Sequence, residues 1–246
     1  MKYEKVQKKN PHRVSVNQHI IPIKCIERFT SGNVVELRDL KRGITRNASP
    51  NDEVFICKRM WDHASETGFM KSVEDSFQDL VDKLVEGHSV SVEERNKVVT
   101  EFYSLWCARF FISKHANNEN VFLPVTGDVL TKDEEEKIES MNMAFVRSGG
   151  VMPERFINGG QAQLRYMSYK QVYENTNWGL VTAKKKEFIV PDNFLKVMVV
   201  PISPKLSFIG GCRDGVASNF DVLKVNRAAV KNADSFIFAH KFSMSE

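Results

Sequence analysis

The sequence contains no apolar run that approaches the roughly 20 residues needed to cross a bilayer. Its first segment, residues 1–13, is basic and polar, and it lacks the apolar stretch of a signal peptide. These two features predict a protein of the cytoplasm with no membrane partner.

Cysteine pairs at metal-binding spacing are missing as well. The four cysteines, Cys25, Cys57, Cys107 and Cys212, are scattered along the chain. In a cytoplasmic protein such cysteines are expected to be reduced thiols, most of them buried. The pattern therefore predicts no cysteine-based metal site.

A strong excess of charge of one sign is absent too. With 35 Lys and Arg against 31 Asp and Glu, the formal net charge is only +4. Mild basicity permits contact with nucleic acid without requiring it. Residues 1–13 form a basic segment that we expect to be a flexible arm, either a solvated terminus or an arm that binds phosphate.

What is present is the composition of a globular protein, with 42% hydrophobic and 27% charged residues. No linker, repeat or low-complexity segment interrupts residues 1–246, so we predict a single domain. Strand patterns come first, helical patterns follow, and strand patterns return, which indicates the α+β class. We expect small antiparallel β regions at both ends of the chain, packed around a central helical bundle.

The spacing of apolar residues locates these elements. Strands are predicted at 34–39, 54–57, 180–182, 187–190, 196–200, 206–209 and 236–239, and helices at about 67–86, 92–115, 131–145, 164–173 and 222–232. The segment 151–160 is predicted to be irregular, with a bend at its glycine pair.

Two of the helices carry specific expectations. In the helix at 92–115, large side chains around Trp106 point in too many directions for a one-sided amphipathic helix, so this helix should be central and buried. The helix after Thr131 begins with a capping box, Thr131-x-x-Glu134. Its buried stripe is predicted to be Ile138, Met141 and Phe145.

Short motifs near both ends of the chain give the sequence a family resemblance. Gln18-His19-Ile20-Ile21-Pro22 opens an apolar segment that ends at Phe29, and Glu74 stands shortly before Phe77. Asp192-Asn193 precedes Pro201-Ile202-Ser203-Pro204. The pattern resembles a bacterial and phage-borne domain family of unknown function, although Pro191 and Phe194 replace the Ser and Pro that often flank its Asp-Asn pair.

The resemblance implies a genetic context rather than an activity. Genes of this family resemble cargo of mobile elements and defence systems. We therefore expect a prophage- or defence-associated protein of the phage-exclusion type that binds nucleic acid or a nucleic-acid-handling protein. An oligomer is compatible with the sequence.

Two basic clusters are the candidate contacts for nucleic acid. Lys58 and Arg59 stand close to Trp61, which combines positive charge with a surface for base stacking. Residues Lys184, Lys185 and Lys186 are predicted at a hairpin tip, where lysines can contact phosphates. The alternatives are a half-buried tryptophan at a sheet edge and a solvated turn.

The alternative function is a metal-dependent nuclease. His19, Glu74, Asp192 and Asn193 are polar residues within apolar motifs, and together they could hold a divalent cation that activates water. His19-Ile-Ile-Pro also resembles the start of an HNH nuclease motif, whose later half would fall near His63. The structural alternative is that His19 bonds a backbone carbonyl, Glu74 pairs or caps, and Asp192-Asn193 forms a turn.

Overall fold

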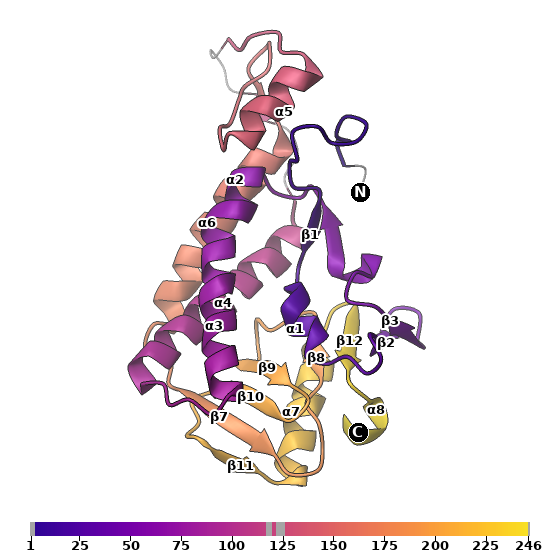
Figure 1. Cartoon of the computed structure of the whole chain (residues 1–246), viewed down its shortest axis with the longest axis vertical. Helices are drawn as coiled ribbons and strands as arrows, with labels where there is room; N and C mark the ends of the chain where they lie inside the picture. Colours follow the sequence, from indigo (N-terminus) through magenta and orange to yellow (C-terminus); the bar gives the residue numbers. More distant parts are fainter. Residues whose placement is uncertain (1–2, 117–119, 122–125, 246) are drawn as a thin grey trace.

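Long helices, two four-stranded sheets and two two-stranded sheets make up the described part of the molecule, which was studied as a computed structural model (Figure 1). The structure describes residues 3–116, 120–121 and 126–245. The α+β class predicted from the sequence is confirmed, with helices at the centre of the packing. One large hydrophobic core joins the part of the chain from Ile21 to Trp61, the central helices and the two four-stranded sheets.

The N-terminal part is built from short elements. They are β1 (Asn17–His19), α1 (Ile23–Glu27), β2 (Val35–Asp39), β3 (Ile44–Ala48), a 3-10 turn (Glu53–Phe55), β4 (Ile56–Lys58), α2 (His63–Ser65) and a π-helical turn (Glu66–Met70). β1 pairs antiparallel with β4 in a two-stranded sheet. The side chain of Gln18, fully buried in β1, accepts hydrogen bonds from Met60 N and Trp61 N and donates one to Trp61 O. This contact fixes the chain where it leaves β4 for α2.

The central helices contribute Phe77, Phe102, Tyr103 and Trp106 to the large core. They are α3 (Lys71–Val85), α4 (Val92–Lys114) and α6 (Glu154–Tyr173), with the shorter α5 (Lys132–Ser140) and the two-residue strands β5 (Asn120–Val121) and β6 (Val151–Met152) between them. α4 packs against both α3 and α6. Trp106 is only 2% exposed and packs against Phe194, with ring centroids 3.9 Å apart and the rings tilted by 51°. The prediction of a central buried helix is confirmed.

The C-terminal part completes two four-stranded sheets. Its elements are β7 (Trp178–Ala183), β8 (Val190–Pro191), β9 (Val199–Ser203), β10 (Leu206–Gly210), β11 (Gly215–Ala217), α7 (Asn219–Asn232), β12 (Phe236–Ala239) and α8 (Phe242–Ser245). One sheet has the order β11-β7-β10-β9 and the other β3-β2-β12-β8. Because β12 pairs with β2, the two ends of the chain share one sheet.

Strand positions near the prolines differ from the prediction. The strands expected at 187–190 and 196–200 are β8 at Val190–Pro191 and β9 at Val199–Ser203. Both strands contain a proline, and both lie at the edge of their sheet. Proline has no N–H to donate to a second neighbour, so an edge position accommodates it. The pairing of β11 with β7 is parallel, which the antiparallel prediction missed.

The bend predicted at Gly159-Gly160 lies inside helix α6, which begins at Glu154 rather than near residue 164. Close packing explains the first glycine. A Cβ at position 159 would lie 1.8 Å from Asp62 Oδ2 and 2.5 Å from Ser65 Oγ. Gly159 therefore lets α2 approach α6, and the glycine pair marks a helix contact rather than a helix end.

The buried face of α5 also differs from the prediction. The capping box at Thr131 and Glu134 is present. Phe145 is buried as predicted but lies beyond the end of the helix, whereas Met141, also beyond it, is 59% exposed. The buried residues of α5 are Glu135, Glu136 and Glu139. A helix can bury carboxylates in place of apolar side chains only where cations are buried with them.

The N-terminal segment was predicted to be a flexible arm, but its described part, residues 3–13, packs on α5. The backbone N–H of Gln7 donates to Glu136 Oε1 (2.9 Å), and His12 Nε2 lies 2.7 Å from Asp133 Oδ1. Lys132 Nζ donates to the Glu4 carboxylate (2.6 Å). We call this stretch, residues 3–13, the basic ribbon.

Replacing Trp106 tests whether α4 organises the core. Trp106→Ala should lower the free energy of unfolding by about 3–5 kcal/mol, because it leaves a large cavity between α4 and Phe194. The measurement is equilibrium unfolding in urea. Met167→Ala, at an exposed position of α6, is the matched control and should have little effect. A Trp106→Ala monomer as stable as the unmodified chain would contradict the central role of α4.

Candidate functional site

His19 and Glu74, two of the predicted site residues, meet around a buried arginine. Arg109 of α4 is 2% exposed and forms an ion pair with Glu74 of α3. Its Nη1 also donates to the backbone carbonyl of His19 (3.3 Å). The Arg109 guanidinium thus joins β1, α3 and α4 at one point.

A second carboxylate and an aromatic ring complete this centre. Glu66 Oε2 lies 3.5 Å from Arg109 Nη2 and accepts a hydrogen bond from Trp61 Nε1 (2.5 Å). The Arg109 guanidinium lies 5.4 Å from the centroid of the Trp61 ring. Arginine suits such a position because its planar cation can pair and stack at the same time. We call His19, Trp61, Glu66, Glu74 and Arg109 the Arg109 centre.

Burial shifts the pKa values of two groups in the centre. Desolvation lowers the pKa of His19, and it raises the pKa of Glu74 against the opposing charge of Arg109. His19 Nε2 lies 3.3 Å from Pro50 O, so this nitrogen carries the proton that it donates to the carbonyl. The imidazole therefore has a backbone partner, as in the structural alternative considered for the sequence.

Asp192 and Asn193 make a different set of contacts. The Asp192 carboxylate accepts hydrogen bonds from the backbone N–H groups of Asp234 (2.8 Å) and Ser235 (2.9 Å), just before β12. Asn193 donates to Asn232 O (3.1 Å) and accepts from Leu195 N (3.0 Å). This pair fixes the end of α7 and the start of β12. Burial raises the pKa of Asp192, while the two N–H donors act against that change.

These contacts do not form the metal site of the nuclease alternative. Within residues 3–116, 120–121 and 126–245, no group of three or more His, Cys, Asp or Glu side chains is arranged to hold a metal ion. His63, considered for an HNH motif, accepts hydrogen bonds at Nδ1 from Ser15 N (3.1 Å) and Ser15 Oγ (2.9 Å). The four residues His19, Glu74, Asp192 and Asn193 thus act as ties between chain segments.

The predicted nucleic-acid residues Lys58 and Arg59 have opposite environments. Lys58 is exposed in β4. Arg59 is 3% exposed and forms an ion pair with Glu139 of α5, and its Nη1 donates to Glu4 O (3.2 Å). Arg59 is therefore unavailable to a nucleic acid. Of the lysines in the loop after β7, Lys184 and Lys185 are exposed and Lys186 is half-buried.

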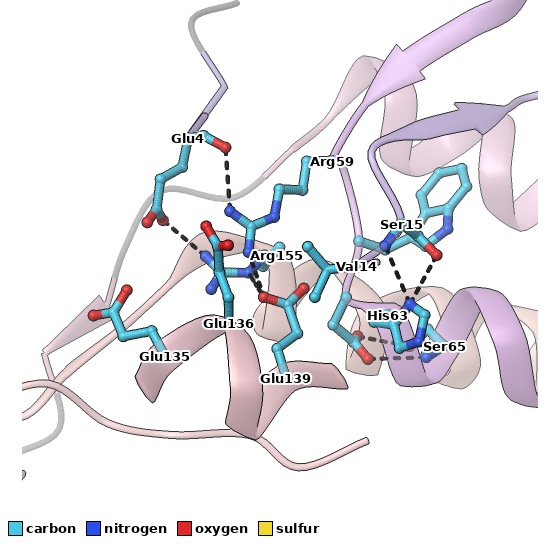
Figure 2. Close-up of polar contacts among 12 residues, drawn as sticks. Glu4, Val14, Ser15, Arg59, His63, Ser65, Glu135, Glu136, Glu139 and Arg155 are labelled. Atoms are coloured by element: carbon cyan, nitrogen blue, oxygen red, sulfur yellow. Dashed lines mark hydrogen bonds and ion pairs between the residues drawn. The ribbon is translucent and has the colours of Figure 1, made fainter. Parts of the chain in front are cut away.

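Arg59 belongs to a buried ionic network that the sequence analysis missed (Figure 2). Arg155 of α6 donates to Glu139 Oε2 (2.9 Å) and to Glu4 Oε2 (2.8 Å). Arg147 donates to Glu135 (2.6 Å) and to Glu4 Oε1 (2.8 Å). In the sequence, the network is indicated only by the run of acids at 133–136 and 139. The first of these acids also fit the first turn of a helix, where negative charge is favourable, so the run did not point to buried ion pairs.

The network makes Glu4 strongly acidic. Burial acts to raise its pKa, but the hydrogen bond from Lys132 and the charges of Arg155, Lys132 and Arg147 lower it to about 2. Glu4 therefore remains ionised in the folded protein over nearly the whole acid range. Its carboxylate ties the basic ribbon to α5, α6 and the loop that carries Arg147.

Comparison of the chain with protein-family models, with curated proteins and with solved structures gave no match. The family resemblance therefore remains a prediction. Among the described residues, no helix has both the length and the apolar character needed to span a membrane.

Glu74 can be tested against its neighbour on the same helix. Glu74→Gln removes the charge that faces buried Arg109, and Glu66 compensates only in part at 3.5 Å. We expect a loss of about 1–3 kcal/mol in the free energy of unfolding, measured in urea. Asp75→Asn, which affects only an exposed pair with Lys71, is the matched control and should leave stability unchanged. Equal effects of the two changes would contradict the structural role of the Arg109 centre.

The lowered pKa of Glu4 predicts how the free energy of unfolding depends on pH. Its pKa is lower in the folded than in the unfolded chain, so its contribution is complete above about 4.5 and is lost as the pH falls toward about 2. Glu4→Gln should cost about 1–2 kcal/mol at neutral pH, a value reduced by partial solvent screening. The difference from the unmodified protein should shrink over that acid range.

Chemical denaturation at a series of pH values measures this difference. Glu53→Gln, at an exposed position, is the control and should leave stability almost unaltered throughout. A cost of Glu4→Gln that stays constant from neutral pH to pH 2 would show that the Glu4 carboxylate does not anchor the ribbon.

Proposed function

We propose that the protein binds single-stranded nucleic acid, and that the basic ribbon is the main contact surface. The supporting observation is the division of the ribbon into two faces. Glu4, Gln7 and His12 contact α5 and its surroundings. The basic side chains of the ribbon are exposed and form no ion pair with the described residues; Lys5, Lys8 and Lys9 lie between these anchors, and Arg13 follows His12.

Anchoring of the ribbon favours binding. A mobile arm loses conformational freedom when it captures a ligand, whereas a segment already fixed by its inner side chains loses less. Arrays of lysine and arginine neutralise phosphates and release counterions, which supplies the sequence-independent part of nucleic-acid affinity. The acids nearest the ribbon are engaged: Glu4 with the buried arginines and Asp133 with His12.

Single strands are favoured over duplexes by the surface that continues from the ribbon. Lys58 lies 5.9 Å from the ring centroid of Tyr3 and forms an exposed ion pair with Glu53 (3.5 Å), and all three line a cavity of about 510 Å³ together with Met60 and Glu154. A cation beside an aromatic ring offers an unpaired base a place to stack next to its phosphate. In a duplex, bases are not free to enter such a cavity.

The biological setting is proposed on other grounds. The resemblance to a phage-borne family supports a prophage- or defence-associated role in the cytoplasm. In that setting, the same basic surface would contact a phage nucleic acid during exclusion. The nuclease alternative is less well supported, because His19, Glu74, Asp192 and Asn193 are engaged in contacts within the fold.

Replacing the four exposed cations of the ribbon tests the proposal. Fluorescence anisotropy of a labelled single-stranded oligonucleotide should show binding that weakens as salt is raised. A Lys5→Gln, Lys8→Gln, Lys9→Gln, Arg13→Gln variant should bind more weakly. Its slope of log affinity against log salt should fall by roughly 3, since each lost phosphate contact on a single strand contributes about 0.7.

The matched control is Lys184→Gln, Lys185→Gln, Lys186→Gln, which removes charge from the other predicted cluster. It should leave the salt slope unchanged. If this control lowers the slope and the ribbon variant does not, the contact surface is the loop and the ribbon proposal is wrong. If neither single-stranded DNA nor RNA binds in a salt-dependent way, nucleic-acid binding itself is excluded, and a protein partner becomes the alternative.

A further inference from the structure

A second cavity, far from the ribbon in the chain, is lined by residues of α7 and of the sheet β11-β7-β10-β9. Its volume is about 600 Å³, within the range of sites for small organic ligands. Apolar side chains from both sides line it, among them Val181, Phe188, Ile209 and Val225. We call it the α7 pocket.

Only a few polar groups reach the α7 pocket. Arg213 and Lys224 line it, both are exposed, and neither forms an ion pair with the described residues. The carboxylate of Asp221 is already engaged with the N–H and Oγ of Ser218 in the capping box of α7. The Asp221 carboxylate keeps its negative charge, so the side chains of Arg213, Lys224 and Asp221 leave the pocket with a net charge of +1.

The loop that carries Arg213 is fixed in place. Gly211 N donates to Asn177 O (2.8 Å), and Asp214 accepts from Leu180 N (2.8 Å) and from Arg95 Nη1 (2.7 Å). At Gly179 of β7, a Cβ would lie 2.6 Å from Arg213 O, so the glycine permits the loop to lie against the strand. The entrance is thus preformed, as expected of small-molecule sites.

We infer that the α7 pocket binds a small amphiphile, an apolar chain bearing a carboxylate in the class of medium-chain fatty acids. The apolar lining would accept the chain, and Arg213 and Lys224 would bind the carboxylate at the rim. A neutral chain would lose the contact with the cations, and a cationic one would be repelled. This inference is independent of nucleic-acid binding, which uses the opposite part of the chain.

Cys212 provides a reporter at the entrance. It lines the pocket and is exposed, whereas Cys25, Cys57 and Cys107 are buried, and burial raises their pKa values to about 11, 12 and 12. A neutral reagent, 4,4′-dithiodipyridine, should therefore react first at Cys212. Decanoate, below its micelle concentration, should slow this reaction in a saturable manner, and calorimetry should give a matching dissociation constant.

Charge removal separates specific binding from general apolar contact. Arg213→Gln, Lys224→Gln should weaken decanoate binding by about tenfold, the strength of one charge-assisted hydrogen bond, and should leave decanol binding unchanged. Arg227→Gln, Lys231→Gln removes the same charge from exposed positions of α7 that do not line the pocket. This control should bind decanoate like the unmodified protein.

A pocket-filling change tests the location independently. Ala228→Phe places a ring in the pocket and should abolish the effect of decanoate on Cys212. Because Arg213 and Lys224 are exposed, their variants should fold even if Ala228→Phe does not. Equal binding of decanoate and decanol, an equal loss in the Arg227 and Lys231 control, or no protection of Cys212 would each overturn the inference.

Discussion

Buried arginines, each of which needs a carboxylate partner, constrain this fold more than any other feature. Arg59, Arg95, Arg109 and Arg155 are all buried, and each is paired with at least one acid. An arginine left without its partner in such a place would cost several kcal/mol. The partners come from distant parts of the chain, so each pair fixes two segments relative to one another.

This constraint changes the meaning of the polar residues in the sequence motifs. His19 and Glu74 converge on Arg109, and Asp192 converges on the backbone before β12. Polar side chains inside apolar motifs suggest chemistry when only the sequence is known, since burial of a polar group must have a reason. Here contacts within the fold account for the burial of these groups, and among the described residues they do not gather into a set of metal ligands.

The sequence predicted what local rules determine. The α+β class, the burial of Trp106 and the capping box at Thr131 follow from periodicity and capping chemistry, which act over a few residues. The predictions from the sequence were wrong where the environment of a residue is set by a partner far away in the chain. In the sequence, Glu139 is typical of a solvated acid, but in the structure it is buried against Arg59 and Arg155. Gly159 is typical of a bend, but in the structure it leaves room for Asp62 beside helix α6. Likewise Arg59 resembles a nucleic-acid contact until its pairing is known.

The same pairing determines where positive charge remains available. The net charge of +4 counts 35 basic against 31 acidic residues wherever they lie, so it does not show where unpaired positive charge gathers on the surface. The buried network holds Glu4, and thereby the ribbon, while the ribbon's four exposed cations lie between or next to the anchoring residues. The ribbon is therefore held in place by the buried ionic network around Glu4 and Glu139, although the four cations that would contact a ligand lie outside that network. A substitution in the network, such as one at Glu139, should weaken binding without removing any contact, because it frees the segment that carries the cations.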